Sequence, residues 1–447
     1  MGFGLFAIFL SAQANSIGDW PKFLGPNADG TSAETGLLSK IPPAGPAVHW
    51  KRTVGTGYSA PSVLDQKLVL FHRLKNEEVV ECMQSSTGST LWKHSYATTY
   101  EDPYGYNNGP RCTPLLTSNR CYTFGAEGKL LCLDLQTGKP VWTRDTTADW
   151  SIPSAFFGVG STPWLEGDKL LVMVGGQPQS GMVAFDANTG KTLWESVGRK
   201  NWEGQPMIGW PGDRTVVWNP SEKQASYASP IVATIHGRRV AFCLMRQGLV
   251  ALNPENGEVW FSRWFRSRLN DSVNATTPLI TGDQIFVSAT YYRVGSFLLQ
   301  VKPSLKDFDQ VWAGLGMELH WSQPFLVEGH LYGFTGRNEP DASFRCIEFK
   351  TGKTLWDREE SWVPRSSPTP PVFGRAAAIL AEKKLIVLGE GGLLGIFAPT
   401  PEAPHEISRW QVPELHYPCW VAPVLSRKKL YLRSEDRLYC LDWSSKP

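Results

Sequence analysis

The sequence predicts an all-β fold: a single eight-bladed β-propeller with four antiparallel strands in each blade. Three observations lead to this prediction. A motif that ends in tryptophan recurs along the chain, a motif centred on proline recurs in phase with it, and the residues between the two marks divide into four short strand patterns. Units of about 40–50 residues with four strands each are typical of propeller blades.

The tryptophan motif is fullest in CLDLQTGKPVW (132–142), AFDANTGKTLW (184–194) and CIEFKTGKTLW (346–356). Its glycine suits a tight hairpin turn, and its wide indole ring can cover the flank of the neighbouring blade. We therefore expect a ring of structural docking residues at the end of each motif. They are Trp50, Trp92, Trp142, Trp194, Trp260, Trp312, Trp356 and Trp410.

The proline motif marks the start of each inner strand, where a missing N–H group is tolerated. A small or polar residue precedes the proline in most copies, and Ala377 stands at about that position in the seventh. The third unit shows the whole pattern: after Pro163 and a turn come a strand over 169–174, a strand over 182–186 and an outer strand from Thr192. The prolines are Pro61, Pro114, Pro163, Pro230, Pro278, Pro324 and Pro423.

Ring closure can be read from the two ends of the repeats. The last unit has Pro423 but no tryptophan strand, whereas the strand around Trp50 precedes the first proline. We expect residues 46–53 to supply the outer strand of the last blade, which would pair an otherwise open edge. The predicted organisation is a signal peptide over 1–14, a lead segment over 15–45 and the propeller over 46–447.

The N-terminus predicts export to the periplasm or secretion. Residues 3–12 are almost entirely apolar, too few to span a bilayer, and Ala12-Gln13-Ala14 suits signal cleavage. An N-terminal strand or a misassigned start codon is the alternative. A formal net charge of +2 gives no general attraction to nucleic acid. We expect a monomer that neither binds nucleic acid nor spans a membrane.

The repeated pattern Ala/Cys-Phe/Leu/Ile-Asp/Glu-x-x-Thr-Gly-x-x-x-Trp resembles the tryptophan-docking motif of pyrroloquinoline-quinone-type (PQQ-type) propellers, over nearly all the chain after the signal. That group includes quinoprotein alcohol dehydrogenases and the propeller lipoprotein of the outer-membrane β-barrel assembly machinery. In the dehydrogenases the quinone lies on the propeller axis, stacked on a tryptophan and chelated to calcium beside a catalytic aspartate. An adjacent pair of cysteines often covers its other face, and this chain has no such pair.

The cysteines and catalytic motifs give little support to an enzyme. Cys82, Cys132, Cys346 and Cys440 share one repeat position, which indicates buried packing thiols; a disulfide between Cys121 and Cys132 stays open. No CxxC, GxSxG, HExxH, P-loop or EF-hand motif occurs, so we expect no metal site and cannot name catalytic residues.

Candidate ligand-binding residues lie where loops should open onto the channel mouth. Insertions follow the outer strands, arginines gather between the second and third strands, and rigidly held loops are where function concentrates. Some of these arginines could simply pair with Glu127, Glu339, Glu390 or Glu435. The predicted mouth residues are Asn107, Asn108, Arg111, Arg246, Asn274, Arg293, His320, Trp321, Arg337 and Trp420.

Two functions remain in view. The first is an exported scaffold without a cofactor, which binds a small anionic or sugar-like ligand or a protein partner. The second is a PQQ- and calcium-dependent alcohol or sugar dehydrogenase, as the resemblance implies. Because calcium ligands cannot be matched residue by residue, the sequence favours the scaffold and leaves catalysis open.

Overall fold

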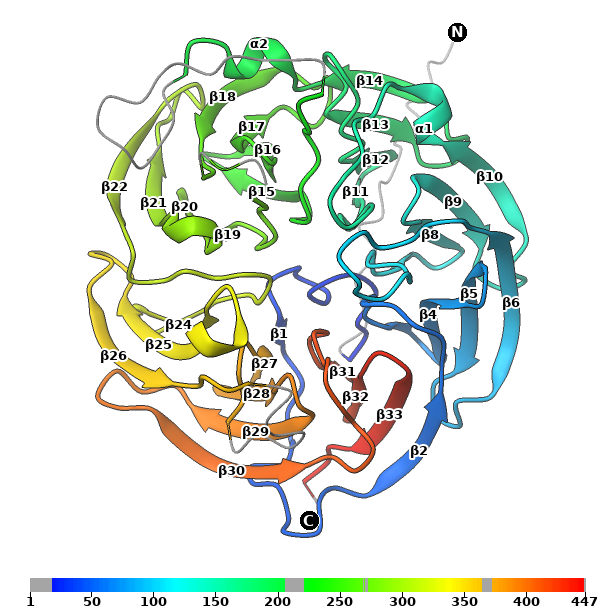
Figure 1. The fold of residues 1–447 in the computed structure, drawn as a ribbon, viewed down its shortest axis with the longest axis vertical. Helices are drawn as coiled ribbons and strands as arrows, with labels where there is room; N and C mark the ends of the chain where they lie inside the picture. The colour runs from blue at the N-terminus through cyan, green and yellow to red at the C-terminus, as the bar shows by residue number, and fades with distance from the viewer. Residues whose placement is uncertain (1–17, 206–220, 268, 270–271, 364–371, 446–447) are drawn as a thin grey trace, which may run out of the picture.

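Eight antiparallel sheets stand side by side around one axis in the computed structural model, which describes residues 18–205, 221–267, 269, 272–363 and 372–445 (Figure 1). Each sheet is one blade of four strands, and the seventh gains a fifth, parallel strand. The predicted eight-bladed propeller is therefore confirmed.

The strands of each blade follow one another from the axis to the rim. Blades 1 and 2 contain β3 (Ser62–Leu64), β4 (Lys67–Leu74), β5 (Glu77–Gln84), β6 (Thr90–Ala97), β7 (Leu115–Leu116), β8 (Arg120–Phe124), β9 (Lys129–Asp134) and β10 (Pro140–Asp145). Blades 3 and 4 contain β11 (Trp164–Glu166), β12 (Lys169–Val172), β13 (Met182–Asp186), β14 (Thr192–Ser196), β15 (Ile231–Ile235), β16 (Arg238–Leu244), β17 (Gly248–Leu252) and β18 (Val259–Trp264).

The second half of the ring repeats this order. Blades 5 and 6 contain β19 (Leu279–Thr281), β20 (Gln284–Ala289), β21 (Gly295–Val301), β22 (Phe308–Gly314), β23 (Phe325–Val327), β24 (His330–Thr335), β25 (Ser343–Glu348) and β26 (Thr354–Glu359). Blade 7 contains β27 (Ala377–Ala381), β28 (Lys384–Leu388), β29 (Leu393–Ala398), β30 (His405–Gln411) and β1 (Thr31–Ser32). Short helices α1 (Thr146–Asp149) and α2 (Arg199–Trp202) interrupt two of the loops between blades.

Blade 8 is completed by a strand from the other end of the chain. Its sheet has the order β2-β33-β32-β31, formed by β31 (Val424–Ser426), β32 (Lys429–Arg433), β33 (Arg437–Asp442) and β2 (Val48–Thr53). Trp50 in β2 pairs with Cys440 in the antiparallel ladder. The predicted closure by residues 46–53 is confirmed.

The docking tryptophans join each blade to the next by a hydrogen bond as well as by apolar contact. The indole N–H of Trp142, for example, donates to the carbonyl oxygen of Ala187 at 2.9 Å. Gly190, with φ of 71°, lies beneath this ring, and a Cβ there would come within 2.7 Å of it. The motif glycine thus allows the tight turn of its own hairpin and leaves room for the tryptophan ring of the preceding blade. Equivalent indole bonds are made by Trp50, Trp92, Trp194, Trp312 and Trp356.

The register differs from the sequence prediction in two blades. In blade 4, Phe261 rather than Trp260 follows the β-bulge and pairs with Ala251, because Phe261 stands four residues after the turn glycine Gly257 and Trp260 only three. In blade 7, Ser408 holds that register, and the ring of Trp410 instead covers Gly45. These two positions correct the predicted docking ring.

Hydroxyl groups connect the inner strands of the first five blades. The residue before each proline donates its backbone N–H to the side-chain hydroxyl of the equivalent residue in the next blade. Ala60 donates to Thr113 at 3.2 Å, Thr113 to Thr162 at 3.1 Å, Thr162 to Ser229 at 3.0 Å, and Ser229 to Thr277 at 3.3 Å. This hydroxyl belt explains why small polar residues precede the prolines.

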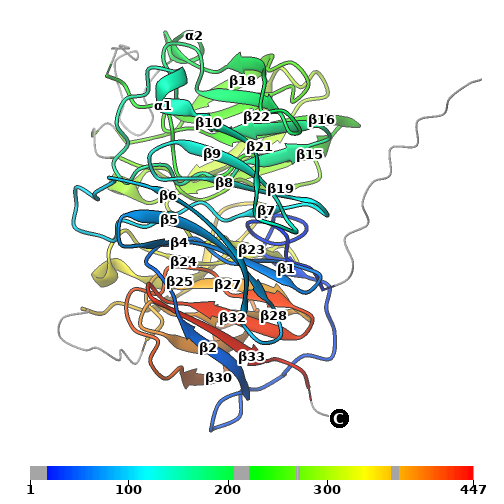
Figure 2. The ribbon, with the colours of Figure 1, turned by 90° about the vertical axis from the view of Figure 1, so that its right-hand side faces the viewer.

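Residues 18–45, the lead segment, run along one face of the ring. Trp20 exchanges two backbone hydrogen bonds with Val63 at 2.8 Å, and the ammonium group of Lys22 lies 4.0 Å from the Trp164 ring. Further on, β1 pairs with β27, and the Glu34 carboxylate accepts the backbone N–H of Lys428 at 2.6 Å. The lead segment lies on the face opposite α1 and α2 (Figure 2).

Two further sequence expectations meet the structure here. All eight cysteines are buried free thiols, and burial raises the pKa of Cys132 to about 12. Within the described residues, no helix has the length and apolar character needed to cross a bilayer. The predicted signal peptide lies outside the residues that the structure describes.

Candidate ligand-binding site

A cavity of about 200 Å³ lies where the eight inner strands begin. One register position builds its wall in every blade: the residue three before the inner-strand proline, with Ala378 in place of the proline in blade 7. The structure thus corrects the predicted Ala377 by one residue. The eight wall residues are Tyr58, Arg111, Gly160, Tyr227, Ala275, Trp321, Arg375 and Trp420.

Aromatic rings dominate one side of this wall. The rings of Trp321 and Trp420 lie 5.2 Å apart, and that of Tyr58 lies 5.0 Å from Trp420. The Arg375 guanidinium group lies 4.6 Å from the Trp321 ring, within reach of a cation–π interaction. His320 packs edge-on against Tyr291 and at a tilt against Trp321, and adds a further ring. This side of the cavity therefore offers flat, weakly polar faces.

Arg375 is held by two carboxylates and is only 5% exposed. Its guanidinium group donates to Glu390 at 2.8 Å and also bonds Glu339. The buried Glu390 accepts the Trp420 indole N–H at 2.6 Å, so one carboxylate fixes both a cation and a ring of the wall. Burial lowers the pKa of Arg375, but the attraction of Glu390 outweighs it and the net shift is upward. The guanidinium group stays protonated, and the two carboxylates balance its positive charge.

Arg111 is neutralised in the same way. It donates to Asp102 at 2.6 Å and to the Gly109 carbonyl oxygen at 2.6 Å, and the Asp102 side chain is fully buried. Burial, reinforced by Arg375, holds the pKa of His320 well below its usual range, so this imidazole is neutral. The wall therefore presents guanidinium groups without a net positive charge.

The remaining lining combines apolar side chains with uncharged polar ones, and one contribution comes from outside the blades. Hydroxyl and amide side chains surround the cavity, and the lead segment adds Phe23 and Leu24 on the side opposite the long loops. Hydroxyl and amide groups suit a ligand that itself carries hydroxyl groups. The hydroxyl and amide side chains of the lining include Thr113, Thr162, Ser229, Ser322 and Gln323.

Four of the predicted mouth residues line the cavity: Arg111, His320, Trp321 and Trp420. Two others shape its rim. Asn107 accepts the Gly109 backbone N–H at 2.9 Å, and Asn108 accepts that of Asp102 at 2.8 Å. Their amide groups therefore hold the loop that carries Arg111.

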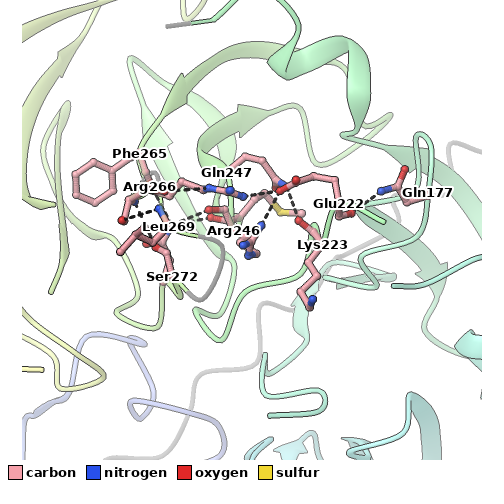
Figure 3. Close-up of polar contacts among 12 residues, drawn as sticks. Gln177, Glu222, Lys223, Arg246, Gln247, Phe265, Arg266, Leu269 and Ser272 are labelled. Atoms are coloured by element: carbon pink, nitrogen blue, oxygen red, sulfur yellow. Dashed lines mark hydrogen bonds and ion pairs between the residues drawn. The ribbon is translucent and has the colours of Figure 1, made fainter. Parts of the chain in front are cut away.

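Four more predicted residues do not line the cavity and bond elsewhere. The buried Arg246 pairs with Glu222 at 2.6 Å, and Arg266 bonds the same carboxylate oxygen (Figure 3). Burial lowers the pKa of Arg246 to about 10. The Asn274 amide donates to the Met245 carbonyl oxygen at 2.9 Å, away from the ligand space.

The last two predicted residues lie in the loops of blades 5 and 6 and do not line the cavity. The Arg337 guanidinium group lies 4.7 Å from the Tyr291 ring and 4.3 Å from the Tyr292 ring. The Arg293 side chain is 73% exposed and lies 4.0 Å from Glu318. These two arginines thus contact neighbouring loops and not the cavity.

Sequence reasoning missed Tyr58, Tyr227 and Arg375, although a signal for them was present. Each stands three residues before the inner-strand mark of its blade, as Arg111, Trp321 and Trp420 do. Tyr106 and Phe157, which also line the cavity, come from the loops between blades and share no repeat position.

The wall does not fit a calcium-chelated quinone. Among the described residues, no three His, Cys, Asp or Glu side chains gather as metal ligands. The nearest carboxylates, Asp102, Glu339 and Glu390, are already bonded to arginines. Pockets that hold drug-sized ligands usually have volumes of about 300–1,000 Å³, more than this cavity offers.

The fold, the docking motif and the axial cavity define the class of protein as a PQQ-type repeat propeller. The family model described as outer membrane protein assembly factor BamB matches residues 75–314, more than half of the chain. The chain belongs to this family.

Known proteins resemble the chain more in fold than in sequence. BamB of Aliivibrio fischeri is 35% identical over 74 residues, which are 15% of this chain and only 18% of that protein. The BamB structure from Moraxella catarrhalis has a TM-score of 0.59 at 13% identity and covers 90% of this chain and 98% of that one. A europium-containing methanol dehydrogenase has a TM-score of 0.64 at 12% identity and covers 93% and 89%. These structures share the propeller fold with the chain.

Proposed function

We propose that the protein is an exported, monomeric binding scaffold whose axial cavity receives a neutral, sugar-like ring. The observation that carries the proposal is the charge balance of the aromatic wall: Arg111 and Arg375 are each held by carboxylates of the same chain. An anion would have to compete with those carboxylates. A neutral ring would not.

The chemistry of the lining supports a sugar in particular. The C–H faces of a pyranose can pack on flat rings such as Trp321 and Trp420. Its hydroxyl groups can bond the hydroxyl and amide side chains around the cavity and the fixed guanidinium groups. At about −0.3 kcal/mol per non-hydrogen atom, one sugar ring would bind with a Kd in the millimolar range.

The supports for the cellular context are separate from the cavity. The apolar N-terminal stretch followed by Ala12-Gln13-Ala14 favours export. The family description names an outer membrane assembly factor, which is a statement about those relatives. Mass spectrometry of the mature N-terminus, expected at Asn15, tests export; an intact Met1 on a cytoplasmic product would contradict it.

Binding is tested by tryptophan fluorescence, because Trp321 and Trp420 line the cavity. Titration with glucose, galactose and N-acetylglucosamine should give a saturable signal that Trp420→Ala abolishes. Trp260→Phe, a half-buried ring remote from the cavity, serves as the matched control and should bind normally. If none of these sugars binds, the proposed ligand class is wrong.

PQQ with calcium is titrated in parallel. Quinone binding together with alcohol- or sugar-dependent reduction of an artificial electron acceptor would overturn the scaffold proposal in favour of a dehydrogenase. We expect neither signal, because the wall offers no grouped metal ligands among its described residues.

A further inference from the structure

Aromatic side chains form a continuous track from the cavity to the protein surface. The Tyr106 ring lies 5.4 Å from Trp420 in the wall and 5.8 Å from Phe157, and the Tyr104 ring lies 5.2 Å from Phe157. Tyr106 is 46% exposed and Tyr104 is 54% exposed. Grouped, exposed aromatic rings beside a cavity are unusual on a protein surface and mark binding sites.

The loop that carries the two tyrosines is held in place by one buried carboxylate. Asp102 accepts the backbone N–H of Tyr104 at 2.9 Å and that of Tyr106 at 3.4 Å. Its other carboxylate oxygen pairs with Arg111 in the wall. The exposed rings are therefore fixed relative to the cavity before any ligand arrives, which lowers the entropy cost of binding.

The lead segment lies at the other end of the cavity. Phe23 and Leu24 line it from the lead segment, which lies across the face opposite the long loops (Figure 2). Leu24 is buried, and Gly25 behind it packs against the Trp20 ring. A chain-like ligand that enters from the side of Tyr106 would meet Phe23 and Leu24 with its leading end.

We propose that the site recognises the terminal unit of a neutral oligosaccharide, with the following sugar units lying over Tyr106 and Tyr104. This inference rests on the proposed function, since it assumes that a sugar ring occupies the cavity. It adds the length and the orientation of the ligand. One end lies inside the cavity, and the chain leads outward across the aromatic track.

The lining favours a saccharide over an apolar peptide. Among the described lining residues, the branched aliphatic side chains are Leu24 and Val421, whereas hydroxyl and amide groups contact the cavity from most blades. The hydroxyl groups of Thr113, Thr162 and Ser229 accept backbone N–H groups but can still donate their own hydrogen, and an aliphatic peptide side chain would leave that donor unused. A sugar unit can bond them.

The test compares chain length at constant chemistry. Calorimetry is performed with glucose and N-acetylglucosamine and with their linear malto-, cello- and chito-oligomers up to the tetramer. In the series that binds, the tetramer should bind roughly tenfold more tightly than the single sugar, as one added aromatic contact allows. Per sugar unit, a long polymer should bind less than the tetramer because it has few ends.

Two variants test whether Tyr104 causes the gain in affinity with chain length. Tyr104→Ser should remove most of the gain with chain length and leave binding of the single sugar unchanged, because Tyr104 lies outside the cavity lining. Leu91→Ser is the matched control: Leu91 is 48% exposed on the outer strand β6, and its loss should change neither affinity.

Each outcome has a distinct meaning. Binding of single sugars without any gain for the tetramer refutes the track and leaves the proposed function intact. Tighter binding of the polymer per sugar unit refutes recognition of a chain end. If no sugar binds, both proposals fail, and binding of tyrosine- or tryptophan-containing peptides would then assign the track to a protein partner.

Discussion

Replacing Trp142 by alanine tests the contact that joins one blade to the next. Trp142 is 9% exposed, donates its indole N–H to Ala187 at 2.9 Å and packs on Gly190. A buried aromatic ring removes about 150–250 Å² from water, worth about 4–6 kcal/mol at 25 cal/mol per Å² as an upper bound. Measured losses for Trp→Ala substitutions are about 3–5 kcal/mol. We expect a loss of about 4 kcal/mol in the free energy of unfolding.

The assay is thermal and urea unfolding of the full chain. Unfolding entropy is about 2.1 cal/mol/K per residue, so for 447 residues this loss lowers the Tm by about 4 °C. Val141→Ala is the control, because Val141 is 40% exposed on the same strand. The Tm of this variant should stay within about 1 °C of the parent protein's Tm. Equal melting of Trp142→Ala and the parent protein would refute the docking role of the ring.

Three other predictions address closure, pH and thiol reactivity. Deletion of residues 46–53 leaves the β33 edge unpaired, so the protein should aggregate on size-exclusion chromatography; a monomer with unchanged Tm would disprove closure. Burial lowers the pKa of Lys22 to about 8, below its unfolded value, so stability should rise between about pH 8 and pH 10. Urea midpoints should show this rise flattened in Lys22→Met, and an equal slope in both proteins would count against it. Burial raises the pKa of Cys82 to about 12, so native protein should resist iodoacetamide at neutral pH, whereas unfolded protein should react; mass spectrometry decides.

The blade architecture was predictable because it depends on local, repeated patterns. The turn glycine and the tryptophan four residues later fix the outer hairpin in four blades, and the proline fixes the inner strand. The closure by β2 could be deduced because the last unit lacks an outer strand, whereas the outer strand around Trp50 precedes the first complete unit. Where the pattern degenerates, as at Trp260 and Trp410, the register could not be deduced from the tryptophan alone.

The candidate site was only partly predictable. Repeat position identified Arg111, Trp321 and Trp420, but attention to loop arginines led to Arg246 and Arg293, which are respectively buried in a local ion pair and exposed to solvent. Charge alone could not reveal that Arg375 would be the buried wall residue, because its partners come from distant loops.

The lead segment could not be predicted at all from periodicity. Its residues share no repeat with the blades, and its contacts with Val63, Leu116, Trp164 and Lys428 join segments far apart in the sequence. Such contacts depend on a ring that must already exist, so no local pattern specifies them.

The pairing of β2 with β33 also sets the order of events during folding. β2 is synthesised early, but its partner strand is among the last residues to be made, so its edge stays open until the chain is almost complete. Contacts of such high sequence separation slow folding. A ring of this kind holds an incomplete edge for most of its synthesis, and a chain truncated anywhere before β33 never acquires a closed form. A closed ring therefore requires the chain from β2 through β33.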